Sequence, residues 1–309
     1  MEYNTTSKET WNSVNESYPT GSRGIYTGYN IKLSLSITIG VVCIFGLVGN
    51  GTVIWLLGFR IKRNPFTTYI LNLSVADFGL LISLPWMSLV PMFFTYDFII
   101  IYNIFFTVFY SIGQLLLTAI SVDRCVSVLF PIWYRCHRPP RLSTFVCAFI
   151  WVLSSVFNGI PTILNLSGNM RFLSIYFQLL INASLCLPLI TISTLILFIR
   201  VCFKSRQHRR ARILMVVLLT LLFYLFFAFP LNAVFLITYH SPLDIFRYLW
   251  ECMFLTTSLN SSVNPFIYFF IGKKKRSHSR ESVKVILQRV FKEEEAPEAE
   301  EEPPLENQL

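Results

Sequence analysis

The stretch LSLSITIGVVCIFGLVGNGTVIWLLGF, residues 33–59, contains no charged side chain over 27 consecutive positions. A helix of about 20 apolar residues is long enough to cross the hydrocarbon core of a bilayer. Because no water reaches that core, every backbone amide must be satisfied within its own segment, and the alternating pattern of a barrel strand does not occur in this stretch. The stretch is therefore predicted to be a transmembrane helix.

Six further stretches of this kind follow, and together the seven predict an all-α membrane protein with a seven-transmembrane helix bundle. They cover residues 64–96 (interrupted only by Asp77), 98–122, 142–170, 172–199, 213–243 and 252–272. A large soluble helical protein is the alternative. With 54% hydrophobic and 14% charged residues, however, the chain has almost no amphipathic helix left to cover seven buried ones. The composition therefore favours the membrane protein.

The 26 lysines and arginines divide unevenly between the two sides that the spans define. With the N-terminus outside, five lie on the outer side and the other 21 lie on the inner side or at inner helix ends. Lys and Arg are in excess on the cytoplasmic side of membrane proteins, so an extracellular N-terminus is predicted. A basic rim facing anionic lipid accounts for the net charge of +9 without a nucleic-acid partner.

The chain is predicted to divide into four parts. Residues 1–30 form an extracellular tail with glycosylation sequons at Asn4 and Asn15, a third sequon being Asn165 at the outer end of the fourth span. The bundle covers residues 31–272. Residues 273–292 mix basic and apolar side chains, which predicts an amphipathic helix on the inner leaflet, although a solvated basic tail is the alternative. Residues 293–309, rich in Glu and Pro, are predicted to be a disordered acidic tail.

Asp77 is the only charged residue in the middle of a predicted span, and an intramembrane charge is costly enough to suggest a function. Three amides lie at similar depth, Asn50 in the first span and Asn260 and Asn264 in the seventh. They predict a polar cluster that binds water or a small cation such as Na⁺ near Asp77. The alternative is a hydrogen-bonded knot that only specifies helix packing.

A second group of residues has the features of a conformational switch. Asp123 and Arg124 stand where the third span meets the cytoplasm, and an arginine there can be held by the adjacent carboxylate in one state and released to a partner in another. Pro265, which follows Asn264, removes a backbone hydrogen bond near the inner end of the seventh span, so that the helix can bend and move Tyr268. Pro230 marks the sixth span in a similar way.

In order and at matching depth, these features resemble the rhodopsin-like class of G-protein-coupled receptors over residues 30–292. The features are Asn50, Leu-Ser-Val-Ala-Asp77, Asp123-Arg124-Cys125, Trp151, Pro188, Pro230 and Asn264-Pro265-x-x-Tyr268. Stretches such as Arg-Ile-Lys-Arg-Asn-Pro-Phe (60–66) and Leu-Leu-Thr-Ala-Ile-Ser-Val-Asp-Arg-Cys (116–125) are similar to the Mas and Mas-related receptors. The resemblance implies a plasma-membrane receptor that binds peptides or small cationic molecules and couples to arrestin and to heterotrimeric G proteins, often Gq or Gi.

The sequence departs from the wider class at several positions. No cysteine stands near Ile99 at the outer end of the third span, so the usual outer disulfide is missing. Ala228 replaces the usual tryptophan of the sixth span, and Gly113 replaces a serine expected near the cation site.

The outer ends of the spans supply candidate ligand-binding residues of mixed charge and aromatic character. They are Asp97, Tyr102, Phe106, Arg171, Asn232, Asp244 and Glu251. Phe106 occupies the position where amine receptors carry a carboxylate, which argues against a biogenic amine. A transporter or channel is the alternative function, but no charged path or inverted repeat is visible. The four scattered histidines and the lack of paired acids predict neither an enzyme nor a cofactor.

Overall fold

The computed structural model describes residues 20–86, 96–164, 180–204, 208–228, 246–273 and 282–291. Within these ranges the ordered elements are all helices, as predicted, and no strand occurs. They are α1 (Thr20–Phe59), α2 (Pro65–Ser83), α4 (Tyr96–Leu129), α5 (Pro131–Cys136), α6 (Leu142–Leu164), the π-helical turn η1 (Asn182–Cys186), α8 (Leu187–Lys204), α9 (His208–Phe223), the π-helical turn η2 (Tyr224–Ala228), α11 (Phe246–Gly272) and α12 (Val283–Phe291).

Four of the described helices are long and apolar enough to cross a membrane. These segments are Asn30–Phe59, Pro65–Ser83, Ile101–Leu129 and Leu142–Gly159, and shorter apolar helices cover Ser184–Arg200 and Ile213–Phe227. The 27 residues of α11 include many serines and asparagines, which lower its mean hydropathy. Its polar residues face the interior of the bundle, as described below.

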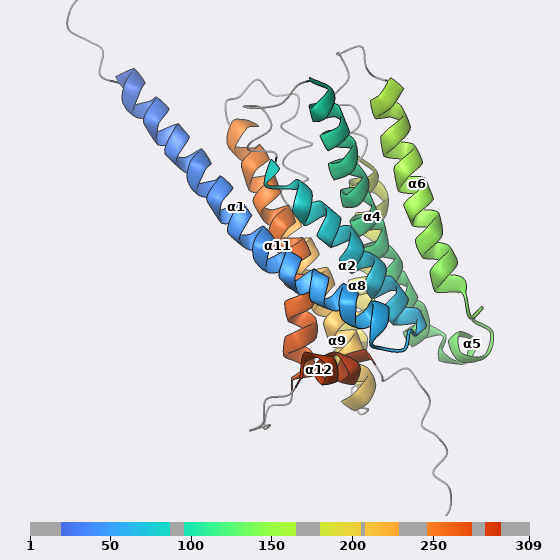
Figure 1. Ribbon diagram of the computed structural model, residues 1–309. Helices are drawn as coiled ribbons and strands as arrows, with labels where there is room; N and C mark the ends of the chain where they lie inside the picture. Colours follow the sequence, from blue (N-terminus) through green and yellow to red (C-terminus); the bar gives the residue numbers. More distant parts are fainter. Residues whose placement is uncertain are drawn as a thin grey trace, which may run out of the picture.

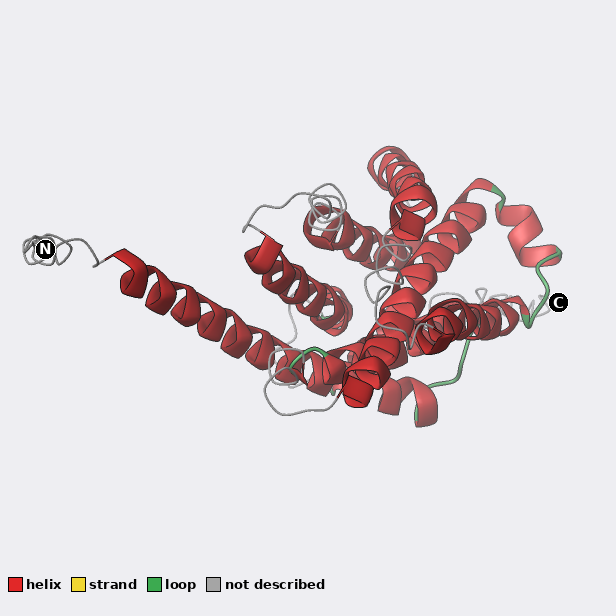
Figure 2. Ribbon diagram, turned by 90° about the horizontal axis from the view of Figure 1, so that it is seen from above, coloured by secondary structure: helices red, strands yellow, loops and turns green. Residues whose placement is uncertain are grey.

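The helices pack as a bundle around α4, which contacts α2, α6, α8 and α9 (Figure 1). Helix α1 packs against α2 and α11 and extends beyond the bundle at one end, whereas α5 and α12 lie at the opposite end (Figure 1). Viewed from above, the long N-terminal helix projects away from the other helices (Figure 2). The fold thus places the C-terminal end of α4 close to α5, with α12 at the same end of the bundle (Figure 1).

The exterior of the bundle is apolar, unlike that of a water-soluble protein, and several polar side chains are buried between its helices. Large apolar side chains point outward, among them Phe45 (62% exposed), Phe145 (68%) and Phe226 (74%), while Asn50 and Ser258 are fully buried. Such an exterior requires lipid as its solvent. Polar side chains that are buried between helices can find hydrogen-bond partners on neighbouring helices. The distribution agrees with the membrane protein that the sequence predicts.

Small residues bring α1 close to α11. A Cβ atom added at Gly49 would lie 3.0 Å from Cβ of Pro265, so the glycine allows this approach. Two hydrogen bonds cross the same contact: Asn50 Nδ2 donates to the carbonyl of Ser261 (3.0 Å), and Ser262 Oγ donates to the carbonyl of Val42 (3.1 Å). The part of α11 around Pro265 is therefore supported by α1.

The observed helix bounds differ from the predicted spans at several ends. Helix α4 continues to Leu129, beyond the predicted end at residue 122, so Asp123 and Arg124 lie inside a helix. Helix α2 ends at Ser83, although the uncharged stretch runs on to residue 96. A helix can continue past an uncharged stretch when the residues that follow pack against neighbouring helices or form ion pairs. It can also end inside an uncharged stretch, because the absence of charge does not by itself extend a helix.

Candidate functional site

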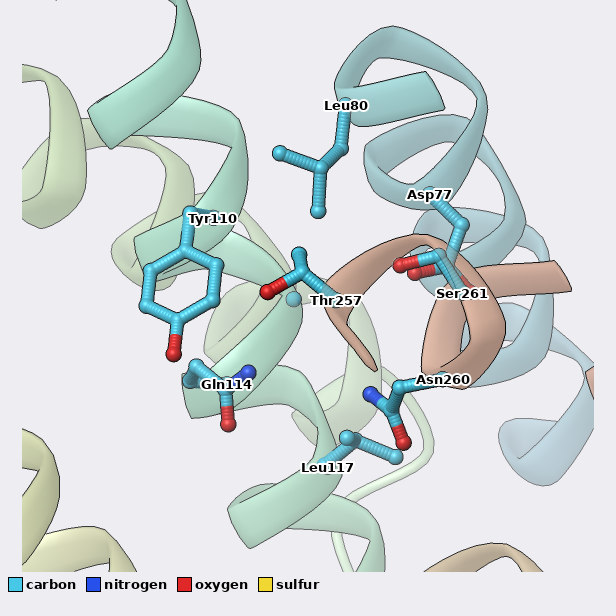
Figure 3. Close-up of a pocket in the computed structure, with 9 residues that line it drawn as sticks. Asp77, Leu80, Tyr110, Gln114, Leu117, Thr257, Asn260 and Ser261 are labelled. Atoms are coloured by element: carbon cyan, nitrogen blue, oxygen red, sulfur yellow. The ribbon is translucent and has the colours of Figure 1, made fainter. Parts of the chain in front are cut away.

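Asp77 lies on α2 and faces a small cavity between α2, α4 and α11 (Figure 3). The cavity has about 10 Å³ available to the centre of a water-sized sphere, which is room for about one water molecule or small ion. It is lined by Asp77, Leu80, Tyr110, Gly113, Gln114, Leu117, Thr257, Asn260 and Ser261. Two of the residues predicted for the polar cluster, Asp77 and Asn260, therefore line one cavity.

The other two predicted members do not line this cavity, but each donates a hydrogen bond to a residue that does. Asn264 Nδ2 donates a hydrogen bond of 2.8 Å to Oδ2 of Asp77, joining α11 to α2. Asn50 donates to the carbonyls of Gly46 and Ser261 and thereby ties α1 to α11. The structure thus brings all four predicted residues together, with Asn50 one layer away from the carboxylate.

The cavity contains hydrogen-bond acceptors that have no donor among the described residues. Buried oxygens of Gln114 and Asn260 accept no hydrogen bond from any described residue. A Cβ atom added at Gly113 would lie 4.0 Å from Oδ1 of Asp77, so the glycine that replaces the expected serine leaves open space beside the carboxylate. A carboxylate with nearby amide oxygens is suited to a hard cation or to water. Within the described ranges, no group of three or more His, Cys, Asp and Glu side chains could hold a transition metal.

Near the C-terminal end of α4, Asp123 is the acceptor for three side chains. Arg124 Nη2 lies 2.6 Å from Oδ2 of Asp123, and Arg138 Nη2 lies 2.7 Å from Oδ1. The hydroxyl of Tyr134 on α5 donates to Oδ2 of Asp123 (2.9 Å) and accepts from Arg124 Nη2 (2.7 Å). Arg124 and Arg138 are both almost completely buried. We call Asp123, Arg124, Tyr134 and Arg138 the inner network.

Aromatic rings complete the inner network. The Cζ atom of Arg124 lies 4.7 Å from the ring centroid of Phe66 at the start of α2, and that of Arg138 lies 4.5 Å from the ring centroid of Tyr134. Cation–π contacts of this kind are stronger when they are shielded from water. The guanidinium that the sequence predicts as a switch is therefore held from two sides, by α5 and by α2.

The second predicted switch segment lies in α11. Pro265 stands inside α11, and Tyr268 on the next turn is fully buried. Tyr268 lines an apolar cavity with residues from α2, α4 and α9, including Leu73, Ile120 and Val217. A bend at Pro265 would move Tyr268 relative to this cavity and to the helices that line it.

Two predicted ligand-binding residues, Tyr102 and Phe106, form part of a packed cluster in the outer half of the bundle. The hydroxyl of Tyr102 donates to the carbonyl of Ser83 (2.9 Å), and the ring of Phe106 stacks on Tyr110 at 5.9 Å and meets the edge of Phe254 at 5.6 Å. Both side chains are buried. They connect α4 to α2 and α11, and this packing is sufficient to explain their aromatic character.

Glu251 lies at the outer end of α11 with 9% of its surface exposed. Its Oε1 is 3.9 Å from Nζ of Lys32 on α1, and its buried Oε2 has no hydrogen-bond partner within the described ranges. Lys32 itself is half exposed, so the attraction between the two charges is weakened by solvent. Glu251 is thus a buried acid whose pairing is incomplete.

The remaining predicted residues lie outside the described residues. They are Asn4, Asn15, Asn165, Arg171, Pro230, Asn232 and Asp244, and of Asp97 only the backbone, in the first turn of α4, is described. The six cysteines whose side chains are described, at positions 43, 125, 136, 147, 186 and 252, are free.

Several residues that contribute to these sites were not singled out by the sequence, among them Gln114 and Tyr134. Gln114 lines the Asp77 cavity, and an uncharged amide in the middle of an apolar span is the signal that could have identified it. Tyr134 belongs to the inner network, but nothing in a single tyrosine after Pro131 indicates that the chain folds back onto Asp123. That contact depends on the position of α5.

Comparisons with known proteins agree with this architecture. The family model described as "7 transmembrane receptor (rhodopsin family)" matches residues 49–268. The chain is 37% identical to the proto-oncogene Mas of Rattus norvegicus over 270 residues, covering 83% of each chain. It is 39% identical to the Mas-related G-protein coupled receptor member H of the same organism over 264 residues, covering 82% of each.

A third relative, the Mas-related G-protein coupled receptor member D of Homo sapiens, is 36% identical over 291 residues, with 88% of this chain and 89% of the relative covered. These matches do not favour a transporter or channel. They confirm the seven-transmembrane bundle. They also imply a multi-pass plasma-membrane protein that has a ligand and a G protein as partners. The chain therefore belongs to the rhodopsin family of seven-transmembrane receptors and, within it, to the Mas and Mas-related G-protein-coupled receptors.

Proposed function

We propose that this receptor has an extracellular N-terminus, binds a peptide or a small cationic or amphipathic ligand at its outer end, and activates Gq, Gi or both. Release of Arg124 from the inner network is the activating step. Arrestin is a second cytoplasmic partner of the proposed receptor. Asn4, Asn15 and Asn165 are its proposed glycosylation sites. The uneven distribution of Lys and Arg supports the orientation, since 21 of the 26 lie toward the side proposed to be cytoplasmic.

The observation that carries this proposal is the double restraint on Arg124. The same carboxylate, Asp123, binds Arg124 and Arg138, and the hydroxyl of Tyr134 bridges Arg124 and Asp123. A buried charge that is fully paired in one arrangement can change partner only through a discrete rearrangement, which is the requirement for a two-state switch. A G-protein helix that supplies new acceptors for Arg124 then stabilises the second arrangement.

Glu251 is the residue that best supports a cationic ligand. Of the predicted outer residues whose side chains the structure describes, Glu251 alone is acidic. Its Oε2 accepts no hydrogen bond from any described residue. A cationic group that reaches Oε2 would satisfy a buried acceptor, and hydrogen bonds to charged groups are among the stronger ones in proteins.

The Asp77 cavity is proposed to bind Na⁺ in the arrangement described here. The carboxylate, the unpartnered oxygens of Gln114 and Asn260 and the hydroxyls of Thr257 and Ser261 supply oxygen ligands around one small space. The alternative is a hydrogen-bonded polar cluster that specifies helix packing and needs no ion. The two differ in whether Na⁺ stabilises the receptor.

The test of receptor function is a panel of G-protein and arrestin biosensors in cells that express the wild type or Arg124→Ala. Basal or ligand-evoked signals in the wild type, lost in Arg124→Ala at equal surface expression, are expected. Arg141→Ala is the matched control, because Arg141 is exposed and lies outside the inner network. Ion flux without any biosensor response would contradict the proposal.

A further inference from the structure

Helix α12 (Val283–Phe291) lies across the lower ends of α11 and α9 (Figure 1). Its apolar residues Ile286, Leu287, Val290 and Phe291 are each exposed by 2% or less, because the bundle itself covers them. Val283 and Val285 point away from the bundle and are exposed. The larger apolar face of this helix is thus covered by protein, and only the smaller one remains for the inner leaflet.

The ring of Phe291 at the end of α12 packs between two helices of the bundle, α2 and α11, and we call this packing position the Phe291 seat. Its ring centroid lies 6.0 Å from that of Phe66 on α2 and 5.7 Å from that of Tyr268 on α11. Asn64, which also caps the start of α2, donates from Nδ2 to the Phe291 carbonyl (2.8 Å). This bond satisfies one of the carbonyls that every helix leaves unpaired at its C-terminus.

Gly272 at the end of α11 makes the approach of α12 possible. A Cβ atom at this position would lie 2.6 Å from the carbonyl oxygen of Ile286 and 2.8 Å from Cγ2 of Val290. Backbone at that distance cannot yield as a flexible side chain can, so a residue without Cβ is needed here. The contact between α11 and α12 is therefore specific in shape.

The same seat touches both parts of the switch. The ring of Phe66, which packs on Phe291, also contacts the guanidinium of Arg124, whose Cζ lies 4.7 Å from the ring centroid. Tyr268, the other ring in contact with Phe291, follows Pro265 on the segment that is predicted to bend. A helix in this seat therefore contacts the elements that must rearrange on activation.

We propose that α12 is an internal inhibitor: it occupies the inner surface formed by α2, α9 and α11 and must leave before an amphipathic helix of a G-protein α subunit binds there. The inference rests on the proposed G-protein activation. An amphipathic helix in an apolar groove is a common recognition mode, so one helix can replace another at this surface. Movement of Tyr268 removes one wall of the Phe291 seat, which couples α12 release to the bend of α11.

The test uses one substitution at two positions of the same helix. Val290→Asp places a charge on the buried face of α12, and Val285→Asp places the same charge on its exposed face. Nucleotide exchange on purified Gq and Gi heterotrimers is measured with full-length receptor in membranes at equal receptor content. Hydrogen exchange of the amides of residues 283–291 is measured on the same purified proteins.

We expect Val290→Asp to raise basal nucleotide exchange by about fivefold or more and to remove amide protection of residues 283–291. Val285→Asp should resemble the wild type in both measurements. Phe291→Ala, which adds no charge, should change both in the direction of Val290→Asp.

Three results would overturn the inference. Protection that persists in Val290→Asp means that α12 is not seated through Val290. Lost protection with wild-type basal and ligand-evoked exchange means that α12 does not inhibit, while G-protein activation itself stands. No exchange by the wild type or any variant, with protection lost in Val290→Asp, means that the proposed function has failed as well.

Discussion

Asn264 on α11 donates a hydrogen bond of 2.8 Å to the carboxylate of Asp77 on α2, across 187 positions of sequence. The bond joins the segment around Pro265 to the acid of the central cavity. An ion or water molecule in this cavity therefore acts on the same helix that carries Tyr268.

Sodium should stabilise the wild-type receptor through Asp77. Replacing K⁺ by Na⁺ at constant ionic strength is expected to raise the apparent melting temperature of the purified receptor by roughly 3 °C when Na⁺ is about tenfold above its dissociation constant. Asp77→Asn should abolish the difference, because the only full negative charge of the cavity is removed. Glu251→Gln is the matched control and should retain it. Equal melting temperatures of the wild type in both salts would support the knot without an ion.

Removal of hydrogen bonds from the inner network should raise basal signalling in graded steps. Tyr134→Phe removes the hydroxyl that joins Arg124 to Asp123 but keeps the ring that Arg138 contacts. Asp123→Asn removes the charge that pairs with both arginines. We expect Tyr134→Phe to raise basal biosensor signals by up to about tenfold and Asp123→Asn to raise them further.

Trp133→Phe serves as the control for these two variants, because Trp133 is on the same short helix and is half exposed. A basal signal in Tyr134→Phe that equals or falls below the wild type would show that the hydroxyl does not restrain Arg124.

Phe106 should behave as a packing residue. Phe106→Ala is expected to cost about 3–5 kcal/mol and to lower the apparent melting temperature by roughly 5–10 °C, since the ring contacts Tyr110 and Phe254 in a buried cluster. Phe105→Ala, the same change at a 42% exposed neighbour, should cost much less. If Phe106→Ala melts like the wild type but responds more weakly to ligands, the ring is a ligand contact, as the sequence suggested.

Glu251 is expected to anchor a cationic ligand. In a library of basic and amphipathic peptides, an agonist that uses this acid should lose about tenfold or more in potency on Glu251→Gln. Lys32→Ala removes the nearest competing cation and should leave potency unchanged or raise it. Loss of potency in Asp244→Asn with wild-type behaviour of Glu251→Gln would move the anchor to residue 244.

The sequence by itself determined the membrane class and the number of spans, and it predicts the orientation and the residues of the two switch positions. The length of an uncharged run is a local property that can be compared directly with the thickness of a bilayer, as residues 33–59 illustrate. The excess of Lys and Arg on one side is likewise additive and independent of packing. The motif around Pro265 predicts a bend because proline removes a backbone donor wherever it stands.

Only the tertiary structure decided which residues meet. Rotation of each helix about its axis places Gln114 beside Asp77 and directs Phe106 into a packed cluster, and the position of α5 brings Tyr134 and Arg138 to Asp123. The amphipathic pattern of residues 283–291 was visible in the sequence, but lipid and protein are equally suitable solvents for its apolar side. The contacts of Phe291 with Phe66 and Asn64, which settle this, join positions more than 200 residues apart. Such contacts depend on shape and on the simultaneous packing of several helices, which no local pattern encodes.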